Sequence, residues 1–118
     1  MSKIAVLQMT SGIDMAENAD TIAAAARQAA AQGATILFAP EMAGLLDRDR
    51  ARAAASITAF DNCPFVTAVR AAASENALWI HAGSVPVTDE ENPARNRNRS
   101  FIVDDAGSIR AVYDKIHL

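Results

Sequence analysis

Two charged residues of the sequence stand where they could take part in catalysis. Glu41 follows the apolar run 34–39 and Pro40, at the place where open α/β sheets bind ligands. A carboxylate there can lose enough hydration to act as a general base, although a loop glutamate or a helix-capping acid has the same pattern. Lys115 is a single cation in a strand-like run. It is either a functional cation or a lysine that extends from a strand edge into water.

Asn98 is the third candidate, because it stands between arginines at alternate positions near the start of another strand. These arginines are Arg95, Arg97 and Arg99. Two interpretations stay open for them: a solvated loop or strand start, or an edge that recognises the anion of a carboxylate-bearing substrate. Asn98 is likewise either a turn or strand-start residue or a substrate-binding residue, and spacing alone does not separate the two.

Several other site types have no support in the sequence. His81 and His117 are expected to be structural, since no second His, Cys or carboxylate stands at metal-ligand spacing. The glycine patterns of dinucleotide and phosphate loops are absent, as is the serine-hydrolase pattern GxSxG. The loop after the first predicted strand, 10–12, holds one glycine, which argues against a flavodoxin-like or Rossmann-like binding domain.

Length and composition bound the remaining possibilities. The 118 residues, 51% hydrophobic and 21% charged, suit a chain with one core and no second domain. The net charge of −3, with both signs mixed, argues against nucleic acid as a partner. No apolar run approaches the ~20 residues of a membrane span, and the N-terminus lacks a secretory signal, so no membrane contact is expected. A single cysteine, Cys63, forms no internal disulfide and fits the cytoplasm.

Hydrophobic patterning predicts an α/β layered fold. The expected strands are 3–9, 34–39, 78–82 and a hairpin of 100–104 and 109–113, and the expected helices begin near Asp14, near Asp47 (to Ala59) and at Pro64. Gly33 is expected to end the first helix, and Gly107 to supply the hairpin turn. The run 34–39 has no alternation of apolar and polar residues, so this strand is expected to be covered on both faces. Residues 86–97 are expected to form a polar connection.

Two short motifs in this order resemble the nitrilase (carbon–nitrogen hydrolase) superfamily. They are Phe38-Ala39-Pro40-Glu41-Met42 and Tyr113-Asp114-Lys115-Ile116-His117-Leu118. Further pieces agree in order along the whole chain: 4–9, 33–35, Gly83-Ser84, and Asn98 before the hairpin. Within the family, the sequence most resembles small single-domain amidases of the ω-amidase and deaminated-glutathione amidase type. The resemblance implies a nitrilase-like αββα sandwich, of which this chain is roughly the first half.

The resemblance also implies roles for the candidate residues. In that family a Glu, a Lys and a Cys act together, so Glu41 corresponds to the general base and Lys115 to the cation that stabilises the oxyanion. The implied reaction converts a small amide to a carboxylate and ammonia, with no metal or organic cofactor. The full-length protein is expected to be a homo-oligomer.

The sequence departs from the family pattern in its cysteine. The family nucleophile lies beyond the lysine motif, whereas Cys63 lies between the two motifs beside Pro64 and is expected to be structural. We therefore expect this chain to be the N-terminal portion of one hydrolase domain and to be inactive alone. A non-catalytic, truncated relative that serves as a binding or assembly module is the alternative.

Overall fold

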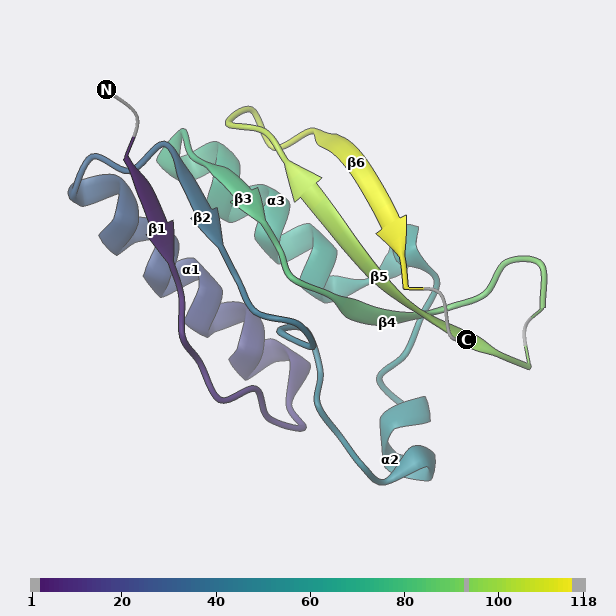
Figure 1. Cartoon of the computed structure of the whole chain (residues 1–118). Helices are drawn as coiled ribbons and strands as arrows, with labels where there is room; N and C mark the ends of the chain where they lie inside the picture. Colours follow the sequence, from purple (N-terminus) through teal and green to yellow (C-terminus); the bar gives the residue numbers. More distant parts are fainter. Residues whose placement is uncertain (1–2, 93, 116–118) are drawn as a thin grey trace.

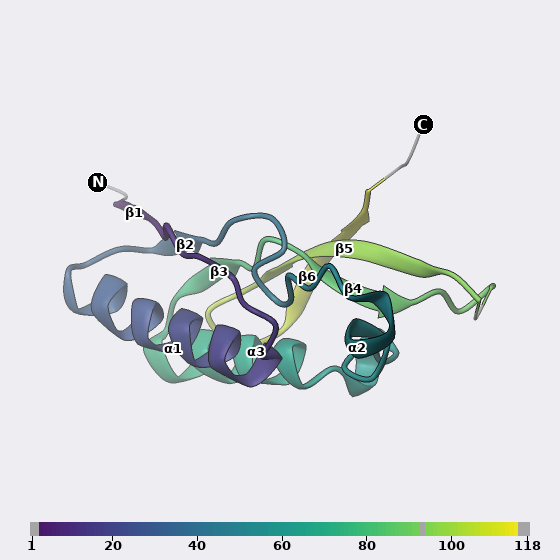
Figure 2. The same cartoon turned by 90° about the horizontal axis from the view of Figure 1, so that it is seen from below.

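The computed structural model describes residues 3–92 and 94–115 and has one mixed β-sheet with its helices on one side (Figures 1 and 2). The strands are β1 (Ile4–Val6), β2 (Ile36–Phe38), β3 (Trp79–His81), β4 (Val85–Thr88), β5 (Asn96–Val103) and β6 (Ile109–Asp114). The helices are α1 (Met15–Ala31), α2 (Arg50–Ala54) and α3 (Pro64–Asn76), with a short 3₁₀ helix at Phe60–Asn62. No helix in these ranges is long and apolar enough to cross a membrane.

The sheet combines parallel and antiparallel pairing. β1, β2 and β3 are parallel neighbours, and β5 runs antiparallel to β3, β4 and β6. Ile102 pairs with His81 on one side and with Ala111 on the other, so β3 and β6 flank opposite edges of β5. β4 follows β3 along the same edge. The carboxyl ends of β2 and β6 therefore point in the same direction (Figure 1).

Local signals fix the long helices and the hairpin as the sequence predicts. The Asp14 carboxylate caps α1 by accepting hydrogen bonds from the backbone N–H groups of Ala16 and Glu17. Gly33 follows α1 with φ +86°, and Pro64 occupies the first turn of α3. Gly107 has φ +85° in the hairpin turn. These four features are confirmed.

Two expected segments differ from the structure. The helix predicted for 47–59 is confined to α2, because the chain beyond it runs to the sheet, where the carbonyl of Thr58 accepts a hydrogen bond from the N–H of Thr88 (3.0 Å). The polar connection predicted for 86–97 is partly strand. Val85 and Val87 are fully buried, so their alternation builds β4 despite the intervening proline.

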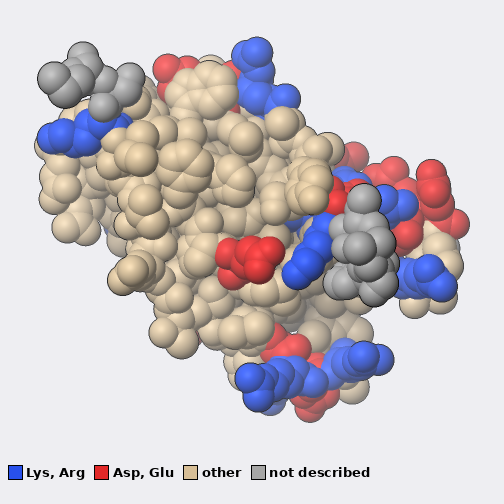
Figure 3. All heavy atoms as spheres, viewed as in Figure 1, with Lys and Arg blue, Asp and Glu red and all other residues tan. Residues whose placement is uncertain are grey.

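One face of the sheet is uncovered, contrary to the expectation for the run 34–39. α1 and α3 pack on the other face, where Leu37 is buried, whereas Ile36 and Phe38 stay partly exposed. Ile4 and Val6 lie on the open face and are 62% and 71% exposed. Figure 3 shows that this face is largely uncharged over β1 to β3. The strand is therefore half-covered, because both long helices lie on one side.

The open face leads us to expect that residues 1–118 self-associate, since a contiguous apolar face in water favours association. Val6→Lys should shift the population toward monomer, because Val6 is the more exposed of the two β1 side chains on that face. Sedimentation velocity over a concentration series measures both. A wild-type chain that stays monomeric at high concentration would contradict this expectation.

Candidate active site

The loop that carries Glu41 is held in place by the bend between β3 and β4. The buried side chain of Ser84 accepts a hydrogen bond from the backbone N–H of Met42 (2.7 Å), and the Ser84 carbonyl accepts another from Gly44 (3.0 Å). Met42 has a left-handed backbone, φ +57°. Gly83, at φ +72°, lies so close to the Pro40 carbonyl that a Cβ would overlap it. These contacts fix the backbone on both sides of Glu41.

Lys115 is positioned by the last pairing between β5 and β6. Its backbone N–H donates to the carbonyl of Asn98 (3.0 Å), so the two residues face each other across adjacent strands. Asn98 in turn pairs with Pro86 on β4. The Oδ1 atom of Asn98 is buried and has no hydrogen-bond partner among the residues that the structure describes.

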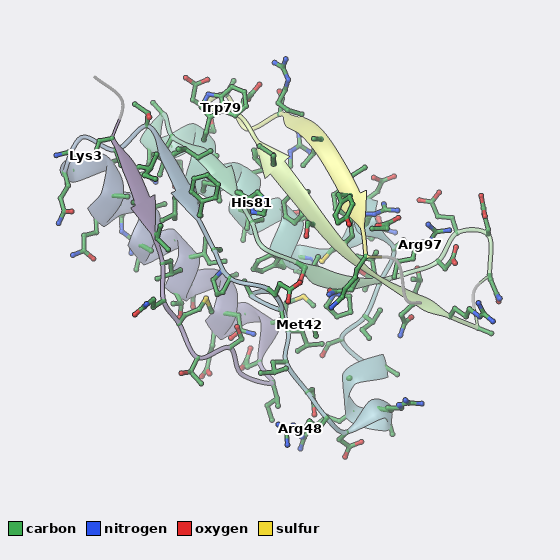
Figure 4. All side chains as sticks on the ribbon, viewed as in Figure 1. Lys3, Met42, Arg48, Trp79, His81 and Arg97 are labelled. Carbon is green, nitrogen blue, oxygen red and sulfur yellow. The ribbon has the colours of Figure 1, made fainter. Side chains whose placement is uncertain are left out.

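One pocket of about 350 Å³ brings together the three candidates, Glu41, Asn98 and Lys115. Its other lining residues are Met42, Pro86, Asn96 and Arg97. Figure 4 shows Met42 on the loop that follows β2. It shows Arg97 on β5, near the connection between β4 and β5. Glu41 and Lys115 are both exposed at the surface of the protein. An acid, a cation and an amide thus meet at the carboxyl ends of β2 and β6.

Arg97 and Arg99 are already bound to carboxylates of the same chain. Arg99 donates from Nε and Nη2 to the two oxygens of Asp114 (2.7 and 3.1 Å), and Arg97 donates to Asp114 (3.0 Å). Arg97 also lies 3.2 Å from Asp89. Both guanidinium groups therefore hold β5 and β6 together. The structure gives no support to the interpretation that Arg97 and Arg99 recognise a substrate anion. Arg95 is exposed.

Asp114 is expected to stabilise the end of β6 in a pH-dependent way. Hydrogen bonds from Arg99, and then from Arg97, hold the pKa of Asp114 below its usual range. A lowered pKa gives stability that is present above the unfolded value, about 3.9, and is lost as the pH falls through the folded value. Asp114→Asn should lower the free energy of unfolding by about 1–2 kcal/mol at pH 7.

This loss should shrink as the pH falls below about 4, because Asp114 is then protonated first in the unfolded chain and, at lower pH, in the folded protein as well. Urea unfolding of the protein at several pH values measures the difference. Asp105→Asn is the matched control, because Asp105 is exposed in the hairpin turn next to Asp104. A loss that is constant from pH 3 to 7 would contradict the ion-pair explanation.

The remaining polar candidates lie outside the pocket. Cys63 is 1% exposed at the start of α3, with its Sγ 3.9 Å from the sulfur of Met15, and it does not line the pocket. His81 stacks on Phe38 on the open face of the sheet, with ring centroids 5.6 Å apart (Figure 4). His117 lies outside the described residues. Within the described ranges, no group of three or more His, Cys, Asp or Glu side chains could hold a metal ion.

Two contributors to the site were not predicted from the sequence. Gly83-Ser84 is one of the segments that resemble the family, but nothing in the sequence around Ser84 indicates that its hydroxyl holds the Glu41 loop. Asp114 could have been found, because a hairpin centred on Gly107 brings it opposite Arg99. Two arginines at alternate positions across from one carboxylate would then indicate an ion-pair cluster.

Comparison with known proteins places the chain in a family. Residues 3–118 match the sequence profile described as carbon-nitrogen hydrolase. The chain belongs to the carbon–nitrogen hydrolase family. The resemblance stated from the two motifs is thereby confirmed.

Individual relatives and solved structures support the assignment to the carbon–nitrogen hydrolase family. The chain is 30% identical over 117 residues to a deaminated glutathione amidase of Yersinia enterocolitica, covering 99% of this chain and 40% of that one. The crystal structure of the C. elegans NitFhit protein matches all of this chain with 29% of its own, at a TM-score of 0.84 and 26% identity. A variant of the amidase from Nesterenkonia sp. AN1 matches all of this chain with 45% of its own length, at a TM-score of 0.82 and 26% sequence identity.

These matches confirm the nitrilase-like α/β fold. They also show that the carbon–nitrogen hydrolase chain described here spans less than half the length of the proteins it resembles.

Proposed function

We propose that the protein hydrolyses small amides, with Glu41 as general base and Lys115 as the cation that stabilises the oxyanion. The observation that carries the proposal is the single pocket lined by both residues and by Asn98. The nucleophile is a cysteine outside residues 1–118. The amidase from Nesterenkonia sp. AN1, in which acrylamide has added to the active site cysteine, supports a cysteine mechanism in this family.

The proposed chemistry divides the work between these groups. The Glu41 carboxylate takes the thiol proton, and the thiolate attacks the amide carbon. Negative charge then develops on the former carbonyl oxygen, where the Lys115 ammonium stabilises it. The proton held by Glu41 passes to the leaving nitrogen, the C–N bond of the tetrahedral intermediate breaks, and ammonia departs, which leaves a thioester. Glu41 next takes a proton from water, which attacks the thioester. Collapse of this second tetrahedral intermediate returns the proton to the cysteine sulfur and releases the product acid, which ionises to the carboxylate.

Asn98 is proposed to bind the substrate. Its buried Oδ1, which has no hydrogen-bond partner among the described residues, is an acceptor that can receive a hydrogen bond from the substrate amide N–H₂. Its backbone carbonyl holds the Lys115 backbone at the same time. Asn98 would thus set the distance between the substrate and the cation.

The protein is proposed to be located in the cytoplasm and to assemble as a homo-oligomer. The free thiol of Cys63 is buried, which suits a reducing compartment without requiring a disulfide. Size-exclusion chromatography of the intact protein, coupled to light scattering, tests the oligomeric state.

Ammonia release from a panel of small amides tests the proposed function. The intact gene product should turn over at least one amide, whereas residues 1–118 alone should show no turnover, because the acyl intermediate needs the missing nucleophile. Cys63→Ala should not change the activity of the intact protein. Turnover by residues 1–118 that disappears in Cys63→Ala would contradict the proposal. An intact protein inactive on every amide would favour the binding-module alternative.

A further inference from the structure

The bend between β3 and β4 contacts the Glu41 loop on both sides of Glu41. Before Glu41, the carbonyl of His81 accepts a hydrogen bond from the N–H of Ala39 (2.9 Å). After Glu41, the hydroxyl and the carbonyl of Ser84 hold the backbone, as described above. Gly83 lies between these two contacts, so its conformation determines how they are placed relative to each other.

The backbone N–H of Gly83 has one hydrogen-bond partner among the described residues, which is the imidazole of His81. It donates to Nδ1 at 3.3 Å. Gly83 is buried, so solvent does not supply a replacement partner. A Cβ on Gly83 would overlap the Pro40 carbonyl, which shows that this backbone packs directly against the residue before Glu41. A rotation of the peptide group that carries this N–H would therefore be transmitted to the Glu41 loop.

The His81 ring is held in its orientation by a second contact. It stacks on Phe38, its cross-strand neighbour on β2, with ring centroids 5.6 Å apart and the planes 28° from parallel (Figure 4). With the ring in this orientation, Nδ1 accepts the Gly83 N–H. An imidazole nitrogen accepts a hydrogen bond only when it carries no proton, so this contact places the ring proton on Nε2.

We propose that His81 is a positioning residue for Glu41. Its neutral imidazole holds Gly83 through Nδ1, and Gly83 in turn supports the backbone that presents the Glu41 carboxylate. His81 does not line the pocket, so it acts through the loop and not on the substrate. This inference rests on the proposed function, because the position of Glu41 affects the rate only if Glu41 transfers protons.

Two substitutions separate the hydrogen bond from the ring stack. The Oδ1 atom of asparagine is as many bonds from the backbone as the Nδ1 atom of histidine, so His81→Asn keeps an acceptor for Gly83 but loses the stack. His81→Phe keeps an aromatic ring on Phe38 but has no acceptor. A ring that serves only to pack predicts that the phenylalanine variant is the better enzyme, whereas the positioning role predicts the asparagine variant.

Steady-state ammonia release by the intact gene product compares these variants on an amide that the wild type hydrolyses. His81→Phe should lower kcat by about 10- to 100-fold, with KM changed less than about 3-fold, because a misplaced base slows the reaction of bound substrate. His81→Asn should stay within about 3-fold of the wild-type kcat. Trp79→Phe is the control and should keep full activity, because Trp79 lies two residues earlier on β3 and pairs with Ile36, away from the Glu41 loop (Figure 4).

The outcomes separate this proposal from the proposed function. If amides are hydrolysed but folded His81→Phe matches the wild type, or both His81 variants lose activity equally, the positioning role is wrong and the amidase function stands. If His81→Phe does not fold, or if no amide is hydrolysed, long-range nitrogen–proton NMR of histidine-labelled intact protein decides, with the His81 signals identified by their loss in His81→Asn. A proton on Nε2 with a bare Nδ1 supports the contact with Gly83. A proton on Nδ1 overturns it.

Discussion

Replacing Lys115 by alanine is expected to lower kcat of the intact protein by at least about 10³-fold, and replacing Glu41 by glutamine should do the same. Lys115 has no substitute in the pocket, because Arg97 is held by Asp89 and Asp114. Glutamine keeps the size of Glu41 but cannot accept the thiol proton. Since both groups are proposed to act mainly after the substrate is bound, KM should change much less than kcat. Steady-state ammonia release measures both constants.

The chain supplies matched controls for these two variants. Lys3 and Lys115 are its two lysines, and Lys3 is exposed, with its ammonium on the Gln32 carbonyl at the far end of α1. Lys3→Ala should therefore keep full activity, as should Glu75→Gln on the exposed side of α3. Near-normal kcat in Glu41→Gln or in Lys115→Ala would show that these residues do not perform the chemistry.

Gly83→Ala is expected to destabilise the intact protein by about 3 kcal/mol or more, because strain and steric overlap add. An alanine at φ +72° is strained by itself, and its Cβ would also overlap the Pro40 carbonyl. Relief of this overlap must move the end of β2, so any folded variant should also lose activity through Glu41. Urea unfolding and ammonia release measure the two effects.

Gly33→Ala separates the two causes. Gly33 has φ +86°, but a Cβ there meets nothing within 4 Å. Its replacement should therefore cost only the backbone strain, about 1–2 kcal/mol, and leave activity unchanged. If Gly83→Ala were no more destabilising than Gly33→Ala, the close approach of Gly83 to Pro40 would not be what holds the loop.

The elements set by local chemistry could be predicted from the sequence. Asp14 and Gly33 mark the two ends of α1, Pro64 starts α3, and Gly107 turns the hairpin, and each acts within a few residues of itself. The extent of α2 and the existence of β4 could not be predicted in this way. Both depend on where Thr58 and Val85 meet the rest of the sheet, which local patterning does not contain.

The candidate site shows the same difference between local signals and contacts across the fold. Glu41 and Lys115 were singled out by their places after and within apolar runs, and the family resemblance supplied their expected roles. The contacts that position them act across the fold, from Ser84 to the Glu41 loop and from Arg99 to Asp114. The arginine pattern of β5 suggested an anion site, yet Arg97 and Arg99 are paired with Asp114 across the hairpin.

Mapping the cysteine that reacts with acrylamide in the intact gene product tests most directly whether residues 1–118 supply the base and the cation but not the nucleophile. Acrylamide adds to the active site cysteine in a variant of the amidase from Nesterenkonia sp. AN1. Peptide mass spectrometry should find the adduct on a cysteine outside residues 1–118, with Cys63 unmodified because its side chain is 1% exposed. An adduct on Cys63 would contradict this division of the site.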